Sequence, residues 1–279
     1  RDLAGVDGLT DAYDVSIVGN DALVDLSGLG AIESVNELNI SDNPALPDLA
    51  GLANLAKAEL LEVRNNLALE NIDALGTSLR SLGSLSLDGC PKVSNVEGLS
   101  NLTSMRGVSI TTSGVTTLDG LRNIEQLMYL DVRAIPIKDF SGLEKALISA
   151  NINIGQASEL ESLRGLSRDI HALAGIVFQD NPKLRDLTGL EMLETLVLLT
   201  IDSSPQLESL KGLENLKTLQ DLIITESALT SLAPLDGLQS ISESADIERN
   251  PSLSQCDIQA FVQRTGAATS SLQDNGPCN

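Results

Sequence analysis

Three residues near the middle of the chain carry side chains that suit the recognition of another molecule. Tyr129, Asp131 and Arg133 alternate with apolar residues, and tyrosine and arginine are among the residue types that contribute most to protein-binding interfaces. Glu62 and Arg64 add opposite charges two repeats away along the chain. These five residues are our candidate ligand-binding residues. The alternative interpretation is that they belong to a solvated surface that binds nothing.

The chain offers little of the chemistry that enzymes use. Its single histidine, His171, lies between Ile170 and Leu173 and has no cysteine cluster beside it to complete a zinc site. A general base would also need a nucleophile and an orienting residue in the same place. The sequence contains no phosphate-loop, dinucleotide-binding or Gly-x-Ser-x-Gly motif. We therefore predict that the protein is not an enzyme and that it uses no metal and no other cofactor.

Charge and composition limit the possible partners. The formal net charge is −21, whereas a surface that binds DNA, RNA or anionic lipid needs a positive region. No run of about 18 apolar residues is present, so no membrane insertion is expected within this chain. Aromatic residues make up only 2% of the chain, so Leu, Ile, Val and Ala must fill a thin, uniform core. Because the chain starts at Arg1 without a Met or a signal peptide, any targeting segment is expected to lie before it.

A short phrase recurs along the chain and predicts the elements that position these side chains. It consists of two apolar residues two positions apart, followed by a small polar residue. The first apolar position recurs every 22 to 24 residues, at Val15, Leu38, Leu61, Leu85, Val108, Leu130, Ile152, Ile176, Leu199, Leu222 and Ala245. This alternation, mostly of β-branched residues at its second position, is typical of a strand with one buried face. We predict one short parallel strand in each repeat, and Tyr129, Asp131 and Arg133 then share the unburied side of their strand.

A small polar residue usually follows five positions after the first apolar one. The column comprises Asn20, Asn43, Asn66, Cys90, Ser113, Ile135, Ala157, Asn181, Ser204, Ser227 and Asn250. After a strand the backbone must turn inward, and a side chain that hydrogen-bonds to the neighbouring turn satisfies its buried amide and carbonyl groups. Stacked turns should therefore build a ladder of hydrogen bonds. We expect that ladder to be interrupted at Ile135 and Ala157, which have no polar side-chain group.

The second half of each repeat carries apolar residues three positions apart, as from Leu187 to Leu196. This spacing suits 3₁₀ turns or an extended arc better than an α-helix. A glycine precedes a leucine in this half of nine repeats, at Gly28, Gly51, Gly98, Gly120, Gly142, Gly165, Gly189, Gly212 and Gly237. Such a glycine indicates a positive φ or a close approach between neighbouring turns. Leu3, Val6 and Leu9 match the same arc, so the chain is expected to begin in the middle of a repeat.

The pattern Leu38-x-Ile40-x-x-Asn43-x-x-Leu46 resembles the leucine-rich-repeat family. The Asn-Pro-x-Leu and Leu-x-Gly-Leu-x-x-Leu phrases in residues 181–193 are similar to the receptor L-domain and bacterial surface branches of that family. The resemblance covers nearly the whole chain. It implies an α/β repeat solenoid: a right-handed coil with one parallel β-sheet on its inner face and a 3₁₀ or extended outer face. A single turn could not bury its own apolar edge, so stability should come from stacked neighbours.

The composition changes where the repeat ends, and the tail must cap the exposed last turn. Ser254 followed by Asp257 resembles a helix-start box, and Gly266 is a suitable stop signal. The apolar residues between them are Ile258, Phe261 and Val262. A short amphipathic helix is therefore predicted. We divide the chain into a solenoid of about eleven turns, residues 1–253, and a disulfide-stapled cap, residues 254–279.

Cys256 and Cys278 flank this cap and are predicted to form a disulfide bond, the alternative being two free thiols. A disulfide would place the protein outside a reducing cytosol, in an extracellular, cell-surface or periplasmic location. Leucine-rich extracellular proteins commonly carry cysteine-rich caps, so the resemblance agrees. The family also accepts cysteine for asparagine in the ladder column, which implies that Cys90 is a buried structural thiol and not a nucleophile.

The leading functional hypothesis is a secreted or cell-surface recognition or adhesion module that binds an extracellular protein or glycan through its repeat surface. The alternative is a structural spacer or scaffold domain of a larger surface protein, with no specific ligand on the sheet. The scarcity of aromatic residues on that surface favours the spacer. A third hypothesis, ice binding by columns of short Ser and Thr side chains, is opposed by Glu62, Asp131 and Val177, which interrupt the columns.

Overall fold

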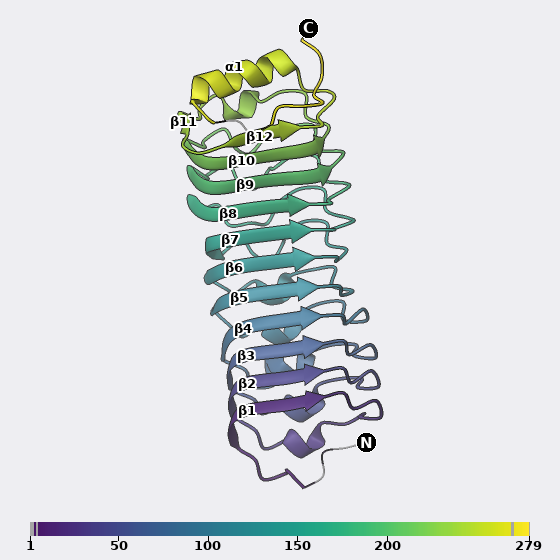
Figure 1. Ribbon diagram of the computed structural model, residues 1–279. Helices are drawn as coiled ribbons and strands as arrows, with labels where there is room; N and C mark the ends of the chain where they lie inside the picture. Colours follow the sequence, from purple (N-terminus) through teal and green to yellow (C-terminus); the bar gives the residue numbers. More distant parts are fainter. Residues whose placement is uncertain (1–2, 4, 269–270, 279) are drawn as a thin grey trace. The chain divides into compact units, whose positions relative to one another are not determined.

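Parallel strands follow one another along the chain, each joined to the next by an arc of 3₁₀ or extended backbone (Figure 1). The computed structural model describes residues 3, 5–268 and 271–278. The chain divides into two compact units. Unit 1 comprises Arg1–Pro136 with Ser141–Ala146, and unit 2 comprises Ile137–Phe140 with Leu147–Asn279.

Unit 1 contains six parallel strands in sequence order. They are β1 (Asp11–Val18), β2 (Ser34–Ser41), β3 (Lys57–Arg64), β4 (Ser81–Asp88), β5 (Ser104–Thr111) and β6 (Gln126–Arg133). The predicted columns stack in register, so that Leu38 pairs with Val15 on one side and with Leu61 on the other. Leu38 and Leu61 are fully buried. The repeat period therefore predicted both the strands and the core of this unit.

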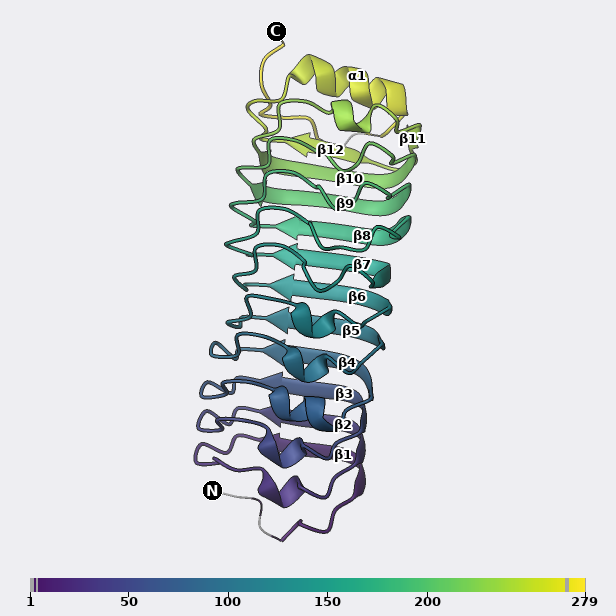
Figure 2. The same cartoon turned by 180° about the vertical axis from the view of Figure 1, so that it is seen from behind.

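The return arcs of unit 1 contain 3₁₀ turns, as the spacing of three predicts. These turns are η1 (Ser27–Leu29), η2 (Ala50–Leu52), η3 (Asp73–Thr77), η4 (Glu97–Leu99) and η5 (Asp119–Leu121). Figure 2 shows them on the side of the unit opposite the strands. Leu3 and residues 5–9 precede β1, and the carbonyl of Leu3 lies against Gly28 of the next turn.

Unit 2 contains β7 (Leu147–Gly155), β8 (Ala172–Gln179), β9 (Thr195–Ser204) and β10 (Thr218–Ser227), followed by the 3₁₀ turn η6 (Ala233–Leu235). The last repeat departs from the prediction of one strand, because its strand is in two pieces. These are β11 (Ser240–Ile241) and β12 (Ala245–Glu248), and both pair with β10 in parallel.

The strands begin earlier than the sequence pattern indicated. A further buried apolar residue stands three or four positions before ten of the eleven first apolar positions. This column comprises Val35, Ala58, Leu82, Met105, Leu127, Ile148, Leu173, Leu196, Leu219 and Ile241. Two or three residues separate it from the first apolar position, which breaks the simple alternation of a strand, so a search for alternating apolar residues does not find the column.

The recurrent glycines meet their neighbours in two ways. At Gly51 a Cβ atom would lie 2.0 Å from the carbonyl oxygen of Leu26 on the preceding turn, so the backbones touch there without an unusual φ. At Gly212 the approach is as close, 2.1 Å from the carbonyl oxygen of Leu187, and φ is also +108°. Both predicted reasons for the glycine, a close approach between turns and a positive φ, are therefore confirmed. A larger side chain at these positions would push the turns apart.

The predicted asparagine ladder is present. Asn43 Nδ2 donates to the carbonyl of Ile17 at 2.9 Å, and Asn43 Oδ1 accepts from the backbone N–H of Asn20 at 3.1 Å. Asn66 repeats the arrangement one turn on, with Ile40 and Asn43 as its backbone partners. The apolar side chains of Ile135 and Ala157 interrupt the ladder, as expected. The interruption begins one turn earlier than expected, because the buried Oγ of Ser113 has no hydrogen-bond partner, and Ser204 leaves a further gap. Between these gaps, Asn181 accepts from the backbone N–H of Ala157 at 3.2 Å.

A left-handed residue stands immediately before each ladder position. Its φ lies between 47° and 72° in every case, and the column comprises Gly19, Asp42, Asn65, Gly89, Thr112, Ala134, Gln156, Asp180, Ser203, Glu226 and Arg249. The backbone N–H of Asp42, for example, donates to the carbonyl of Arg64 on the next turn at 2.9 Å. Only two of these residues are glycine. Stacking against the next turn therefore offsets a conformational strain of about 1 kcal/mol at the others.

The C-terminal cap contains the predicted helix, α1 (Gln255–Thr265). Ser254 Oγ accepts from the backbone N–H of Asp257 at 3.4 Å, and Gly266 ends the helix with a φ of 72°. Ile258 and Phe261 are buried, while Val262 is only half-buried. The sequence pattern missed the role of Arg264, whose guanidinium donates to the carbonyls around η6, including that of Leu238 at 2.7 Å.

The tail after α1 continues the hydrogen-bond ladder beyond residue 253. The backbone N–H of Ile247 donates to the carbonyl of Ser271, and that of Arg249 to the carbonyl of Gln273. Asn275 then takes the next ladder position: its Nδ2 donates to the carbonyl of Ile247 at 2.8 Å, and its Oδ1 accepts from the N–H of Asn250 at 3.1 Å. The tail therefore supplies the hydrogen bonds of one more turn.

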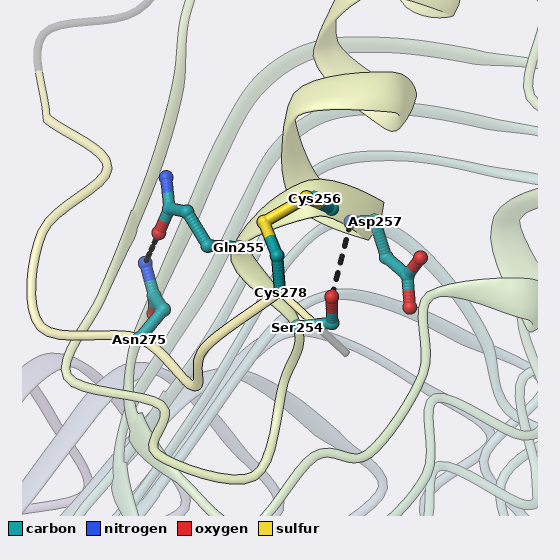
Figure 3. The surroundings of a disulfide bond; sticks show 6 residues. All are labelled: Ser254, Gln255, Cys256, Asp257, Asn275 and Cys278. Carbon is teal, nitrogen blue, oxygen red and sulfur yellow. Dashed lines mark hydrogen bonds between the residues drawn. A yellow bond between two sulfur atoms is a disulfide. The ribbon is translucent and has the colours of Figure 1, made fainter.

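The predicted disulfide joins Cys256 to Cys278, 22 residues apart, and holds this tail against the start of α1 (Figure 3). Asn275 Nδ2 also donates to Oε1 of Gln255 at 3.3 Å beside the bond. The staple therefore sits next to the last position of the ladder.

The ladder makes a first testable prediction. Asn181→Ala should lower the free energy of unfolding by about 2 to 4 kcal/mol, because it leaves the buried carbonyl of Ile154 and the N–H of Ala157 without partners. Ser204→Ala is the matched control, since Ser204 Oγ is buried in the same column without a hydrogen-bond partner, and its loss should be close to neutral. Urea titrations followed by circular dichroism measure both changes. Equal effects in the two variants would contradict the ladder.

The staple makes a second prediction. Replacing Cys256 and Cys278 together by Ser should destabilise the protein by about 3 kcal/mol in the chain-entropy account of a loop of this length. Repeat proteins lose structure locally. Amide hydrogen exchange should therefore rise in α1 and in residues 271–276, and remain unchanged in β1–β6. A uniform rise along the chain would show that the cap does not act locally.

Candidate binding surface

The side chains of Tyr129, Asp131 and Arg133 project from the solvent face of β6, as the strand alternation predicts. Leu130 and Val132 between them are fully buried on the opposite face. The side chain of Arg133 is 57% exposed, whereas that of Asp131 is only 13% exposed. We call Tyr129, Asp131 and Arg133 the Tyr129 patch.

The ring of Tyr129 lies over Gly107 on the neighbouring strand β5. The two residues are register partners, and a Cβ atom on Gly107 would fall 1.8 Å from Cζ of the tyrosine. Tyr129 is consequently half-buried, with one face of its ring against the sheet. The sequence pattern did not single out Gly107. The available signal was a glycine one position before Val108, in a column where only Gly107 and Gly175 lack a side chain.

Arg133 is held by the carboxylate between it and the tyrosine. Arg133 Nη2 donates to Asp131 Oδ2 at 2.7 Å, and Ser109 Oγ donates to the same oxygen at 3.0 Å. The hydrogen bond to Asp131 raises the pKa of Arg133, with smaller contributions from the charges of Asp131 and Asp88. The guanidinium therefore stays charged, and since arginine has five N–H donors, donors remain for an external acceptor.

Glu62 and Arg64 form a separate pair on β3. Arg64 Nη2 donates to Glu62 Oε1 at 2.8 Å, and the arginine side chain is 46% exposed. The register runs from β3 through β4 and β5 to β6, which places this pair three strands from the Tyr129 patch. The predicted separation of two repeats is therefore one too few. The five candidate residues share the solvent face of unit 1 but do not form one cluster.

A third arginine pair continues the same arrangement. Arg106 of β5 lies 3.2 Å from Glu59 of β3, and both side chains are largely exposed. All three arginines on the strands of unit 1 are thus paired with a carboxylate of the same sheet. Such exposed pairs contribute little to stability, at most about 1 kcal/mol each. They instead place three cations, each beside a carboxylate, on the solvent face of the sheet.

Residues suited to metal binding are not gathered in the described part of the chain, where no group of three His, Cys, Asp or Glu side chains could hold an ion. His171 is exposed just before β8, and its Nδ1 lies 3.2 Å from the carbonyl of Met192. None of the helices within residues 5–268 and 271–278 has the length and apolar character needed to cross a membrane.

A hollow of unit 2 has a volume of about 490 Å³ and is lined by residues outside the strands. Four cations line it, at Lys138, Arg164, Arg185 and Lys211. Three carboxylates stand between them, so the charges nearly cancel. This hollow is open and polar, unlike the mostly apolar pockets that hold small molecules.

Cys90 is a buried thiol in the ladder column, as predicted. Its Sγ lies 3.4 Å from the carbonyl of Asp88 and 3.8 Å from that of Val63, where an asparagine amide would donate. Burial raises the pKa of the thiol from its ordinary value of 9.0 to about 11. A thiol with this pKa is protonated at neutral pH and is a poor nucleophile.

These elements together have the fold of a leucine-rich-repeat protein: parallel strands on one side of each turn, 3₁₀ or extended arcs on the other, and a helical cap. A solved structure with the same fold is an internalin (InlF) from Listeria monocytogenes strain 4b F2365. The two chains are 19% identical with a TM-score of 0.64, and the match covers 96% of this chain and 82% of that one. No family model and no curated relative matches the sequence.

The raised pKa of Cys90 predicts a pH dependence of stability. Since the folded-state pKa is the higher one, the neutral thiol stabilises the fold fully below pH 9, and this contribution is lost as the pH rises towards 11. The free-energy difference between the natural protein and a Cys90→Ser variant should therefore shift against the natural protein by about 2 kcal/mol. Urea titrations of both proteins between pH 8 and pH 10.5 measure it. A difference independent of pH would contradict the burial of the thiol.

Proposed function

We propose that this protein is a non-enzymatic recognition module, secreted or displayed at a cell surface, that binds another protein through the solvent face of its sheet. The supporting observation is the Tyr129 patch, which presents an exposed guanidinium beside an aromatic ring already packed against the sheet. Tyrosine and arginine dominate the energetics of protein interfaces, and a ring that is already fixed loses little entropy on binding.

The location rests on the cap. A disulfide persists outside a reducing cytosol, and the bond between Cys256 and Cys278 joins two residues that frame the cap. The net charge of −21 further favours a soluble partner over a nucleic acid or an anionic membrane.

The geometry specifies what the partner must offer at the Tyr129 patch. Arg133 directs one N–H to Asp131 and keeps the others for carbonyl or carboxylate oxygens. The exposed face of the Tyr129 ring can pack against an apolar or cationic side chain. A protein segment with an acceptor next to an apolar group meets both requirements.

The test is a binding screen of immobilised protein against extracellular protein domains and glycans. For a partner so found, Tyr129→Ala with Arg133→Ala should weaken binding by at least about 2 kcal/mol, or roughly thirtyfold, without loss of the circular dichroism spectrum of the fold. Lys92→Ala, which removes one exposed cation from a turn outside the strands, should leave affinity unchanged. A screen in which no protein binds would support the spacer function, and capture of a glycan alone would replace the protein partner.

A further inference from the structure

The solvent face of unit 2 differs from that of unit 1 in its side chains. Val177 of β8, Thr200 of β9 and Ile223 of β10 are register neighbours in one row, and all three are half-buried on the solvent side. Leu198 stands two residues before Thr200 on the same face, and Val197 beside it is 42% exposed. We call Val177, Leu198, Thr200 and Ile223 the Ile223 patch.

The patch is not an incomplete core. Leu222 and Ile224, on either side of Ile223, are fully buried, as are Ile176 and Phe178 around Val177. The core of these turns is therefore complete without the patch. Val177 and Ile223 thus stand outside the core, in a column where several other repeats carry Ser, Asn or Asp.

Carboxylates stand at the edge of this apolar group. Asp221 is the register neighbour of Leu198, and Asp202 lies two residues after Thr200 on the same strand face. Neutral groups orient them: Ser244 Oγ donates to Asp221 Oδ1 at 2.7 Å, and Thr225 Oγ1 donates to Asp202 Oδ1 at 2.5 Å. Both carboxylates are therefore fixed in position while their charge is not neutralised by these contacts.

The strands of unit 2 provide no cation to balance this charge. The sequences of β7 to β12 contain no Lys or Arg, whereas β3, β5 and β6 of unit 1 each carry an arginine paired with a carboxylate. Arg249, which follows β12, forms ion pairs with Glu226 and Glu248, and its charge also acts on Asp202 without forming an ion pair with it. Covering Asp202 and Asp221 with a neutral surface would therefore desolvate two carboxylates that no cation of these strands pairs with, which is unfavourable.

From this combination we infer that the Ile223 patch is a docking surface for a basic polypeptide segment that carries apolar side chains next to Lys or Arg. The inference deepens the proposed recognition function and rests on it. An apolar side chain of the partner covers Leu198 and Ile223, and the neighbouring cation reaches Asp202 or Asp221. The stem of a lysine or arginine can itself lie on the apolar residues while its charged end reaches a carboxylate.

Two other occupants fit the surface less well. A second copy of this chain would bring another acidic surface, since the chain carries a net charge of −21. A polyanion, such as a nucleic acid, would meet Asp202 and Asp221 with like charge. The overall field of the protein instead attracts a cationic segment and increases its rate of encounter.

The test uses the full chain and three matched sets of synthetic peptides. The first set has Leu or Phe flanked by Lys or Arg, the second has the same apolar residues flanked by Glu, and the third has the cations with Ser in place of the apolar residues. Methyl NMR shifts locate binding and fluorescence anisotropy measures affinity. Only the first set should bind, with shifts at Val177, Leu198 and Ile223, and affinity should fall as salt rises.

Two double variants separate the local site from general attraction. Asp202→Asn with Asp221→Asn keeps the hydrogen-bond acceptors but removes two charges, and should weaken peptide binding at least tenfold. Asp14→Asn with Glu37→Gln removes the same charge from the solvent face of unit 1 and should change affinity less than threefold. Equal losses in both variants, equal binding of the third peptide set, or self-association of the chain in place of peptide binding would each overturn the proposal.

The outcome is distinguishable from that of the proposed function. If a protein partner is found whose binding depends on Tyr129 and Arg133 while no cationic peptide shifts Ile223, the docking surface fails and the recognition function stands. If the peptides bind at Ile223 but the screen finds no protein partner, the docking chemistry stands and the proposed function loses its support.

Discussion

The structure depends on the backbone hydrogen bonds that each turn cannot satisfy by itself. Where a strand ends, the chain turns inward and buries amide and carbonyl groups whose partners lie on the neighbouring turn. Asn43 and Asn66 meet this need with bonds that reach 23 to 26 residues back along the chain. The left-handed residue before each ladder position extends the backbone pairing by one residue at the same corner. Stacking therefore determines the conformation of every turn.

The same constraint leaves the outward strand positions free of any structural duty. In unit 1 these positions carry three arginines, each paired with a carboxylate, and a tyrosine ring packed over Gly107. In unit 2 they carry aliphatic side chains beside Asp202 and Asp221, and the strands have no cation. One fold thus presents two surfaces of different chemistry, and function must be argued from these surfaces because a repeat fold alone specifies no partner.

The C-terminal cap solves the problem that stacking creates at the end of a coil. Without a further turn, the amides and carbonyls of the last strand would have no hydrogen-bond partners. The tail supplies partners: the carbonyls of Ser271 and Gln273 and the side chain of Asn275. Helix α1 covers the apolar core, Arg264 fastens it to η6, and the disulfide prevents the tail from leaving. A reducing environment would therefore act first on this end of the chain.

The sequence by itself determined the strands, the return arcs and the ladder, because a repeated local pattern marks each of them, and it determined the cap helix through Ser254 and Gly266 at its ends. The separation of three repeats between Arg64 and Arg133 is also present in the sequence. Only the tertiary structure decided what depends on contacts across turns. The ring of Tyr129 over Gly107 is a cross-strand contact, and Asn275 enters the ladder only after a helix has broken the period. The outward-facing residues are not required to be apolar by burial, so they show no repeated pattern in the sequence. Which of them are neighbours is decided by the strand register, which places Ile223 beside Thr200 and Leu198 beside Asp221.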